Sequence, residues 1–333
     1  MTVPAPLFSI AGFDVYAYSL CLAVGAALGL TLMVLVARMV SERVETVLRL
    51  GLWVIPMGIV GARLAYCLIQ APFLFAEYGV AIISKLSWGG FALVGAVLGA
   101  AGAAWICSAL YKKSFAMLLD LLATAGMLTL ACARFGEAFT LEGVGREVLQ
   151  PMLMRFPFAM PNAYYVEEYH VAVFFWEGIA AMIITIVGIV VLFKFKKNAT
   201  RPGDAAAVVG LLFSVSQIFL ESLREDSFLR FGFVRVNQLL GVAVIAAAVV
   251  YWARDSLAEG GSHKNVIIIT VIQALGVGLL VGIEFALDKS TIPNILLYII
   301  MVLTLVGMCV SALRLRKGSA RRLHVNNDMI INQ

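Results

Sequence analysis

Nine apolar runs of roughly 20 residues each constrain this chain more than any other feature of its sequence. A helix of that length crosses ~30 Å of hydrocarbon, and it satisfies its own backbone hydrogen bonds there. The chain is 62% hydrophobic and only 14% charged, whereas a soluble domain is about half apolar and a quarter charged. We therefore expect an all-α polytopic membrane protein. Its spans are predicted at about 15–37, 50–70, 90–110, 115–133, 171–194, 205–223, 233–252, 265–286 and 293–313.

The loops between these runs alternate in charge. Lys and Arg follow the first, third, fifth, seventh and ninth runs, as at Lys112 and Lys113. Because basic loops favour the cytoplasm, the pattern predicts an external N-terminus and a cytoplasmic C-terminus. The long loop at about 134–170 then forms a small external head. The basic tail, 315–333, is expected to fray or to lie on an anionic inner leaflet.

The net charge of +5 is explained by this loop pattern and gives no sign of nucleic-acid binding. The five cysteines all lie in apolar runs, and none has a metal-ligand spacing such as C-x-x-C. We read them as small apolar side chains within the helices. The sequence therefore predicts neither a metal site nor a soluble cofactor.

Ionisable side chains interrupt several of the runs. Such groups are costly in hydrocarbon and mark functional sites unless they serve only as buried structural pairs. Asp120 lies nearer the inner side and is expected to be structural. The others fall in the outer half of the bilayer, on four different spans: Arg63, Arg134, Glu177, Glu221 and Arg224. Their convergence at one depth predicts a polar cavity that suits an anionic lipid head group.

Glycines accompany these charges. The stretch 134–146 holds the densest cluster of glycines and charges in the first half of the chain. Glycine lets the backbone approach a ligand, and arginine matches a phosphate with paired hydrogen bonds. An interfacial loop with anchoring arginines is the alternative. At the start of the third span, Gly89 and Gly90 can offer amide donors to an anion, while helix packing is expected of Gly95, Gly99 and Gly102.

The order of these motifs resembles the bacterial phosphatidylglycerol–prolipoprotein diacylglyceryl transferases, over about residues 8–250. The stretch 134–146 is similar to the family signature R-x-G-N-F-x-N-x-E-x-x-G. Further similar segments are 15–20 with its motif tyrosine Tyr18, 61–66, 88–95, 175–177, 201–204, 220–227 and 236–238. The resemblance implies a multi-pass enzyme of the bacterial plasma membrane, with a transferase-like core of about seven spans at 1–256.

The chain also departs from the family pattern. Val94 stands where many members carry a histidine, and Glu137 and Thr140 replace the two signature asparagines. The last two spans form an additional hairpin at 257–314, beyond the usual core. Because every family-like motif precedes that hairpin, we expect it to be dispensable for the core site.

The resemblance implies transfer of a diacylglyceryl group from phosphatidylglycerol to the cysteine thiol of a prolipoprotein signal peptide. Such a reaction must stabilise the departing phosphate, deprotonate a thiol of pKa ~8.5 and align the reacting atoms. No metal or soluble cofactor is required. We expect Arg134 and Arg224 to bind the phosphate, Glu142 and Glu221 to orient them, and Arg63 to pair with Glu177.

The general base stays open among Tyr18, Glu137 and His170, and the expected partners are phosphatidylglycerol, signal peptides and the lipid bilayer. Two alternatives remain. One is a non-catalytic or altered-substrate relative that binds anionic lipid or signal peptide. The other is an unrelated transporter, although the sequence lacks the internal repeats typical of transporters. The substrate-binding candidates are Arg63, Tyr66, Gly89, Gly90, Gly145, Arg146, Glu177 and Glu221.

Overall fold

The structure is a computed structural model that describes residues 5–10, 13–85, 89–140, 143–161, 168–195, 201–225, 229–231 and 234–331. Within these ranges, nine helices are long and apolar enough to span a membrane. This confirms the predicted all-α membrane fold. The helices are α1 (Ala17–Met39), α2 (Val44–Ile69), α4 (Leu93–Tyr111), α5 (Phe115–Gly136), α6 (Val173–Phe195), α7 (Asp204–Leu223), α8 (Val236–Ala258), α9 (His263–Lys289) and α10 (Asn294–Ile331).

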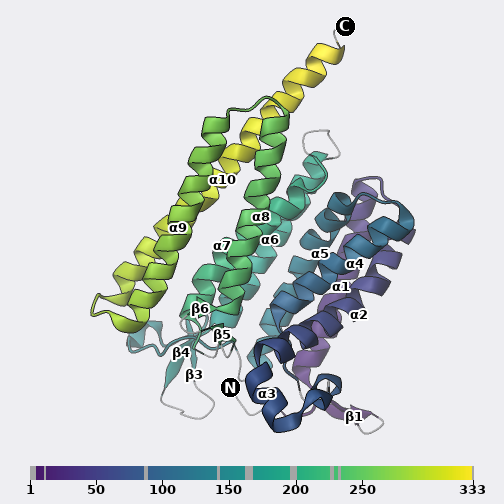
Figure 1. Cartoon of the computed structure of the whole chain (residues 1–333). Coiled ribbons are helices and arrows are strands. Elements are labelled where there is room, and N and C mark those ends of the chain that lie inside the picture. The colour runs from purple at the N-terminus through teal and green to yellow at the C-terminus, as the bar shows by residue number, and fades with distance from the viewer. Residues whose placement is uncertain are drawn as a thin grey trace.

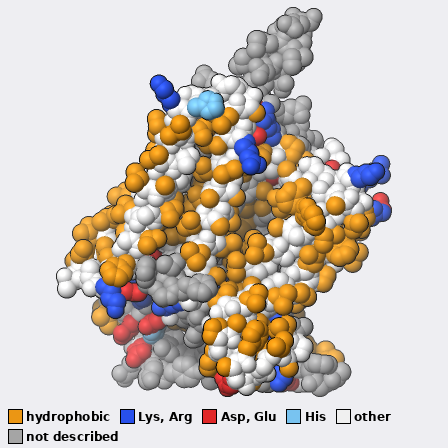
Figure 2. Space-filling view, viewed as in Figure 1, with side chains coloured by type: hydrophobic (Ala, Val, Ile, Leu, Met, Phe, Trp, Pro, Cys, Tyr) orange, Lys and Arg blue, Asp and Glu red, His pale blue; other side chains and the backbone are white. Residues whose placement is uncertain are grey.

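The helices form two groups that α5 and α6 join (Figure 1). One group contains α1, α2 and α4, and the other contains α7, α8, α9 and α10. Helix α5 packs against α1, α6 and α7. Figure 2 shows hydrophobic side chains over the outer faces of the helices, as contact with lipid requires.

Short elements lie at the end of the bundle where α5 and α7 end, which we call the head end (Figure 1). The segment after α5 contains such pieces, as expected for the predicted head, although their individual bounds were not predicted. The short helices are α3 (Ala71–Tyr78), η1 (Val80–Ser84), η3 (Glu137–Phe139) and η4 (Pro151–Leu153). The two-stranded antiparallel pairs are β1 (Phe8–Ile10) with β2 (Phe13–Val15), β3 (Ala159–Pro161) with β4 (Tyr169–Val171), and β5 (Arg230–Phe231) with β6 (Val234–Arg235).

Glycines bring α2 and α4 into backbone contact. A Cβ on Gly95 would collide with the carbonyl oxygen of Gly61, and one on Gly99 would collide with the carbonyl oxygen of Met57. Only glycine therefore permits this approach. The predicted packing role of Gly95 and Gly99 is confirmed.

Asp120 joins α5 to the start of α7, at the end of the bundle opposite the head. Its Oδ2 accepts a hydrogen bond from the backbone N–H of Gly203 at 2.6 Å, and its Oδ1 accepts one from Ala206 at 2.7 Å. The carboxylate thus satisfies donors at a helix N-terminus, which have no partner within the helix. This agrees with the structural role expected of Asp120.

The additional hairpin, α9 and α10, is packed firmly against the core. Met301 and Leu305 are fully buried in the same hydrophobic cluster as residues of α7 and α8. At the opposite end, the Arg316 guanidinium binds both carboxylate oxygens of Asp204, at 2.9 and 2.7 Å. Helix α10 continues to Ile331, so the fraying alternative does not hold for 315–331, and the position of the tail on an inner leaflet stays a prediction. These contacts also argue against the expectation that the hairpin is dispensable.

Candidate active site

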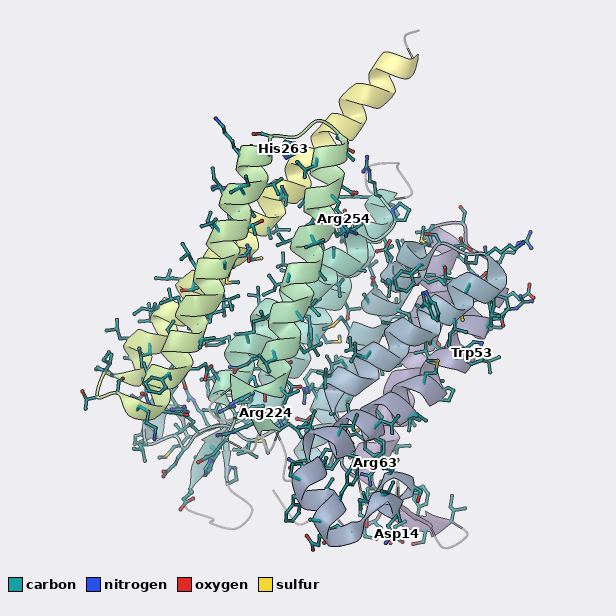
Figure 3. All side chains as sticks on the ribbon, in the orientation of Figure 1. Asp14, Trp53, Arg63, Arg224, Arg254 and His263 are labelled. Carbon is teal, nitrogen blue, oxygen red and sulfur yellow. The ribbon has the colours of Figure 1, made fainter. Side chains whose placement is uncertain are left out.

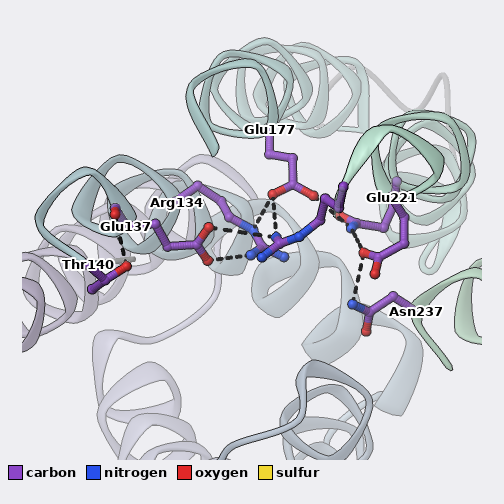
Figure 4. A network of polar contacts seen from close by, with 8 residues as sticks. Arg134, Glu137, Thr140, Glu177, Glu221 and Asn237 are labelled. Carbon is purple, nitrogen blue, oxygen red and sulfur yellow. Dashed lines mark hydrogen bonds and ion pairs between the residues drawn. The ribbon is translucent and has the colours of Figure 1, made fainter. Parts of the chain in front are cut away.

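Two buried arginines from different elements meet at the head end. Arg134 lies in the last turn of α5, and Arg224 follows the last residue of α7. Arg134 Nε lies 3.2 Å from Oε2 of Glu177, and Arg224 Nη1 lies 3.1 Å from the same oxygen. Figure 4 shows Arg134 in contact with the carboxylates of both Glu177 and Glu137. Of the four spans predicted to converge, α5, α6 and α7 bring their charges together here, whereas Arg63 of α2 does not join them.

Glu137 completes the arginine cluster. Its Oε1 accepts a hydrogen bond from Arg134 Nη1 at 2.5 Å, and its Oε2 lies 3.7 Å from Arg224 Nη1. The carboxylate is buried, and among the described residues no donor forms a hydrogen bond with Oε2. Two positive and two negative side chains thus share one desolvated site, which we call the arginine–glutamate cluster (Arg134, Glu137, Glu177 and Arg224).

A second layer of polar side chains holds this cluster. Gln217 Nε2 donates to Glu177 Oε1 at 2.9 Å and to Glu221 Oε2 at 3.0 Å. Asn237 Nδ2, at the start of α8, also donates to Glu221 Oε2 at 3.0 Å. Gln217 was not among the predicted site residues, although it lies four residues before Glu221 and therefore on the same helix face. That spacing of two polar residues in an apolar helix was a usable signal.

Arg235 supports the same helix end from outside the spans. Its Nη1 donates to the backbone carbonyl of Glu221. Burial lowers the pKa of the Arg235 guanidinium, and the nearby Glu221 carboxylate opposes that shift. Arg235 was not among the predicted site residues.

Arg63 does not pair with Glu177, so that expectation is wrong. Its Nη2 donates to the carbonyls of Ile82 at 2.7 Å and Lys85 at 3.0 Å. Its Nη1 donates to the carbonyls of Gly89 and Gly90. Arg63 and Arg224 lie at the same end of the bundle (Figure 3), but Arg63 fastens the chain around η1 to α2. The glycines thus accept hydrogen bonds through their carbonyls here.

Tyr66 lies beside these groups. Its ring centroid is 5.9 Å from the Arg63 guanidinium, within the range of a cation–π contact. Gly90 has φ of +75°, and a Cβ there would overlap the Tyr66 ring. Both features explain the glycine, and they place Arg63, Tyr66, Gly89 and Gly90 in one structural corner.

Tyr18 lies at the start of α1, against the end of α5. A Cβ on Gly136 would be 3.3 Å from Tyr18 Cδ2 and 2.8 Å from Cys21 Cβ. Gly136 directly precedes Glu137, so the tyrosine is close to the cluster. Glu142, the other expected orienting residue, lies outside the described residues.

His170 and Gly145 tie the head to the end of α7. Gly145 forms an antiparallel bridge with Arg224, and its carbonyl lies 2.9 Å from His170 Nδ1. A Cβ on Gly145 would be 2.9 Å from the Leu223 carbonyl oxygen, so a larger residue would disturb this bridge. His170 Nε2 lies 3.6 Å from Glu168. These contacts make His170 a bracing residue in the head and disfavour it as the base.

A hollow opens beside the cluster between α5, α6 and α7. Its cavity volume is about 10 Å³, which is roughly the room that one water molecule needs. Arg134, Glu177 and Gln217 line it together with apolar residues such as Leu130 and Phe213. The hollow is therefore lined by charged and polar side chains on one side and by apolar side chains on the other.

Comparison with known proteins identifies the family. The family model for prolipoprotein diacylglyceryl transferase matches residues 5–254. A phosphatidylglycerol–prolipoprotein diacylglyceryl transferase of Clostridium perfringens is 28% identical over 263 residues, covering 78% of this chain and 98% of the relative. The Clostridium kluyveri protein of that name is 29% identical over 248 residues, covering 74% of this chain and 94% of the relative. This chain therefore belongs to the prolipoprotein diacylglyceryl transferase family.

Proposed function

We propose that this protein transfers a diacylglyceryl group from phosphatidylglycerol to the cysteine thiol of prolipoprotein signal peptides. The family membership supports the reaction. The observation that carries the assignment of the site is the meeting of Arg134 and Arg224 at one carboxylate oxygen of Glu177. Two guanidinium groups that lie 3.2 and 3.1 Å from one atom are close enough to bind two oxygens of one phosphate.

The burial of the cluster suits a leaving phosphate. Electrostatic interactions are stronger in a site that excludes water, and donors fixed in advance need little reorganisation. Glu177 holds both arginines, and Gln217 in turn holds Glu177. This chain of contacts keeps the guanidinium groups in place before the lipid arrives.

Glu137 is our candidate for the general base. Its Oε2 is buried and accepts no hydrogen bond within the described residues, so a thiol can deliver its proton there. The thiolate then attacks the carbon of the diacylated glycerol that is bonded to the phosphate oxygen. The carbon–sulfur bond forms, the carbon–oxygen bond breaks, and glycerol phosphate leaves with the electron pair.

Proton transfer to Glu137 also has an electrostatic consequence. A neutral carboxyl group holds Arg134 less strongly than a carboxylate does. Protonation of Glu137 therefore releases the Arg134 Nη1 donor as negative charge grows on the phosphate. Glu137 thus acts first as the base, and Arg134 then binds the phosphate. This order explains how a site that already contains two glutamates can bind an anion.

The lipid is expected to bind with its phosphate at the cluster and its acyl chains in the bilayer. The hollow is too small for two acyl chains, so they must leave it along the apolar side near Leu130 and Phe213. We place the head end outside the plasma membrane, because the basic loops predict that orientation.

Complementation of a transferase-depleted bacterium tests this function, with mass spectrometry of the lipoprotein cysteine as the readout. Restored growth and a cysteine that carries diacylglycerol are the expected results. An unmodified cysteine, with this protein present in the membrane at normal level, would support the non-catalytic alternative instead.

A further inference from the structure

The α9–α10 hairpin lies beyond the family-matching region, yet its side chains reach the end of α7 that carries the proposed site. Tyr298 of α10 donates its hydroxyl hydrogen to the Ser222 carbonyl at 3.4 Å. Its ring packs edge-on against Phe219, with centroids 6.2 Å apart. Ser222 lies two residues before Arg224, so Tyr298 holds the last turn of the helix that positions this arginine.

Tyr298 also contacts the head. The Arg146 guanidinium lies 5.9 Å from the centre of the Tyr298 ring, within the range of a cation–π contact. The backbone N–H of Arg146 donates to the Leu223 carbonyl at 3.0 Å. One aromatic side chain from the hairpin thus touches both partners of the joint between head and α7.

A second line of contacts begins at Glu284 of α9. Its buried Oε1 accepts a hydrogen bond from Gln238 Nε2 at 2.6 Å. Gln238 Oε1 in turn accepts from the backbone N–H of Arg235 at 3.4 Å, and Arg235 Nη1 donates to the Glu221 carbonyl. The hairpin is therefore linked to the same turn of α7 by a buried polar chain as well as by an aromatic ring.

We infer that Tyr298 and Glu284 are positioning residues for the transferase site, supplied by a hairpin outside the family core. They hold the end of α7 so that Arg224 faces the phosphate and Glu221 keeps its hydrogen bonds with Gln217 and Asn237. This inference rests on the proposed function. Its physical basis is that Arg224 is proposed to bind the lipid phosphate in the ground state as well as in the transition state, so a displaced Arg224 weakens lipid binding and raises the KM for the lipid.

The test compares matched variants of the full-length protein in phosphatidylglycerol vesicles, with a synthetic signal peptide as thiol substrate. Tyr298→Ala and Glu284→Leu remove the two contacts. Tyr298→Phe keeps the ring, and Glu284→Gln keeps the accepting oxygen. The control is Gln273→Leu. Within the part of the chain that the structure describes, Gln273 donates only inside the hairpin, to the Met308 carbonyl and the Ser311 hydroxyl, both at 2.9 Å.

Tyr298→Ala and Glu284→Leu are expected to raise the KM for phosphatidylglycerol about tenfold, which corresponds to about 1.4 kcal/mol. The KM for the peptide should not change. Tyr298→Phe and Glu284→Gln should stay near the wild-type values, as should Gln273→Leu. A purely structural loss removes active molecules and lowers the apparent kcat without raising the KM for one substrate alone.

Unchanged lipid KM in both disruptive variants, or an equal rise in Gln273→Leu, would overturn the inference and leave the proposed function intact. A wild-type protein that forms no thioether would overturn the proposed function, and this inference with it. If Tyr298→Ala does not accumulate, the Glu284 pair decides, because Glu284→Gln preserves both shape and hydrogen bond.

Discussion

Arg134 and Arg224 approach the same atom, Oε2 of Glu177, at 3.2 and 3.1 Å. One buried carboxylate oxygen therefore offsets the repulsion between two guanidinium groups that come from separate helices. The burial of these charges costs free energy, and well-packed apolar side chains would stabilise the helix ends as well or better. The presence of this arrangement at the head end of α5, α6 and α7 is explained by a need to hold two arginines in position for an anion.

The first prediction concerns substitutions of Arg134 and Arg224. Arg134→Ala and Arg224→Ala should each lower thiol lipidation about 10²–10³-fold, because each removes a donor to the developing charge. Lysine should substitute poorly, since a point charge lacks the paired geometry of the guanidinium. The measurement is lipidation per folded molecule, from the membrane level of each variant and the mass of the product.

Val94→Ala serves as control for these variants, because the family pattern that the sequence resembles leads one to expect a histidine at this position. It should be mild. Near-normal specific activity in both arginine variants would refute the phosphate assignment. A large fall in protein level with normal specific activity would instead indicate a structural pair.

Asp120 gives a contrasting prediction at the opposite end of the bundle. Asp120→Ala leaves the buried N–H group of Gly203 and the partly buried one of Ala206 without their acceptor, and the loss at a buried donor costs about 1–3 kcal/mol. We expect a lower unfolding temperature in detergent and less protein in the membrane, with unchanged activity per folded molecule. Asp120→Asn retains one carbonyl acceptor and should be intermediate. Loss of specific activity without loss of stability would contradict the structural role.

The sequence was informative wherever the signal is local. Apolar length predicted the nine spans, and the charges inside those runs predicted that Arg134, Glu177 and Arg224 would lie at one depth. The pairing of Glu177 with the two arginines was not predicted, because Glu177 was assigned to Arg63. Glycine spacing predicted the contact of α2 with α4. These features depend on one helix at a time, or on the depth at which a residue lies.

The partners of Arg63 depend on the path of the chain, so the partner predicted from the sequence was wrong. Its hydrogen bonds go to backbone carbonyls 19 to 27 positions away, and a carbonyl has no sequence signature. The same holds for Tyr298, whose acceptor is the Ser222 carbonyl. Glu177 was predicted as the partner of Arg63 because it carries the opposite charge at a similar depth. The cations that lie next to Glu177 are instead Arg134 and Arg224.

Membrane orientation is predicted by the basic loops. A cysteine introduced as Ser319→Cys should react with an impermeant maleimide only after protoplasts are permeabilised. Gln150→Cys, at an exposed position in the head, should react in intact protoplasts. Labelling of the tail from outside would reverse the orientation.

Removal of the hairpin tests its integration into the core. Truncation after residue 256 exposes apolar faces of α7 and α8 and deprives Asp204 of Arg316 and Gln238 of Glu284. We expect a low membrane level and little activity. Truncation after Gly318 keeps Arg316 and should be nearly normal. A stable, fully active core without the hairpin would show that it is dispensable.

The last prediction separates the candidate bases. Glu137 lies in the arginine–glutamate cluster, whereas the ring nitrogens of His170 face the Gly145 carbonyl and the carboxylates of Glu168 and Glu225. Glu137→Gln should therefore lower lipidation by about 10²–10⁴-fold, the usual loss for a general base, with the membrane level maintained. The amide oxygen still accepts from Arg134, so the orientation of the arginine survives.

Peptide thiol acidity gives the decisive comparison. A peptide whose thiol is already ionised needs no base, so raising the pH toward the thiol pKa of ~8.5 should recover much of the lost rate in Glu137→Gln. The same change should not rescue Arg134→Ala, which lacks a donor to the phosphate. His170→Gln should retain most of its activity, since its contacts brace the head. If Glu137→Gln is nearly fully active while His170→Gln is not, Glu137 only orients Arg134 and the proton leaves by another route.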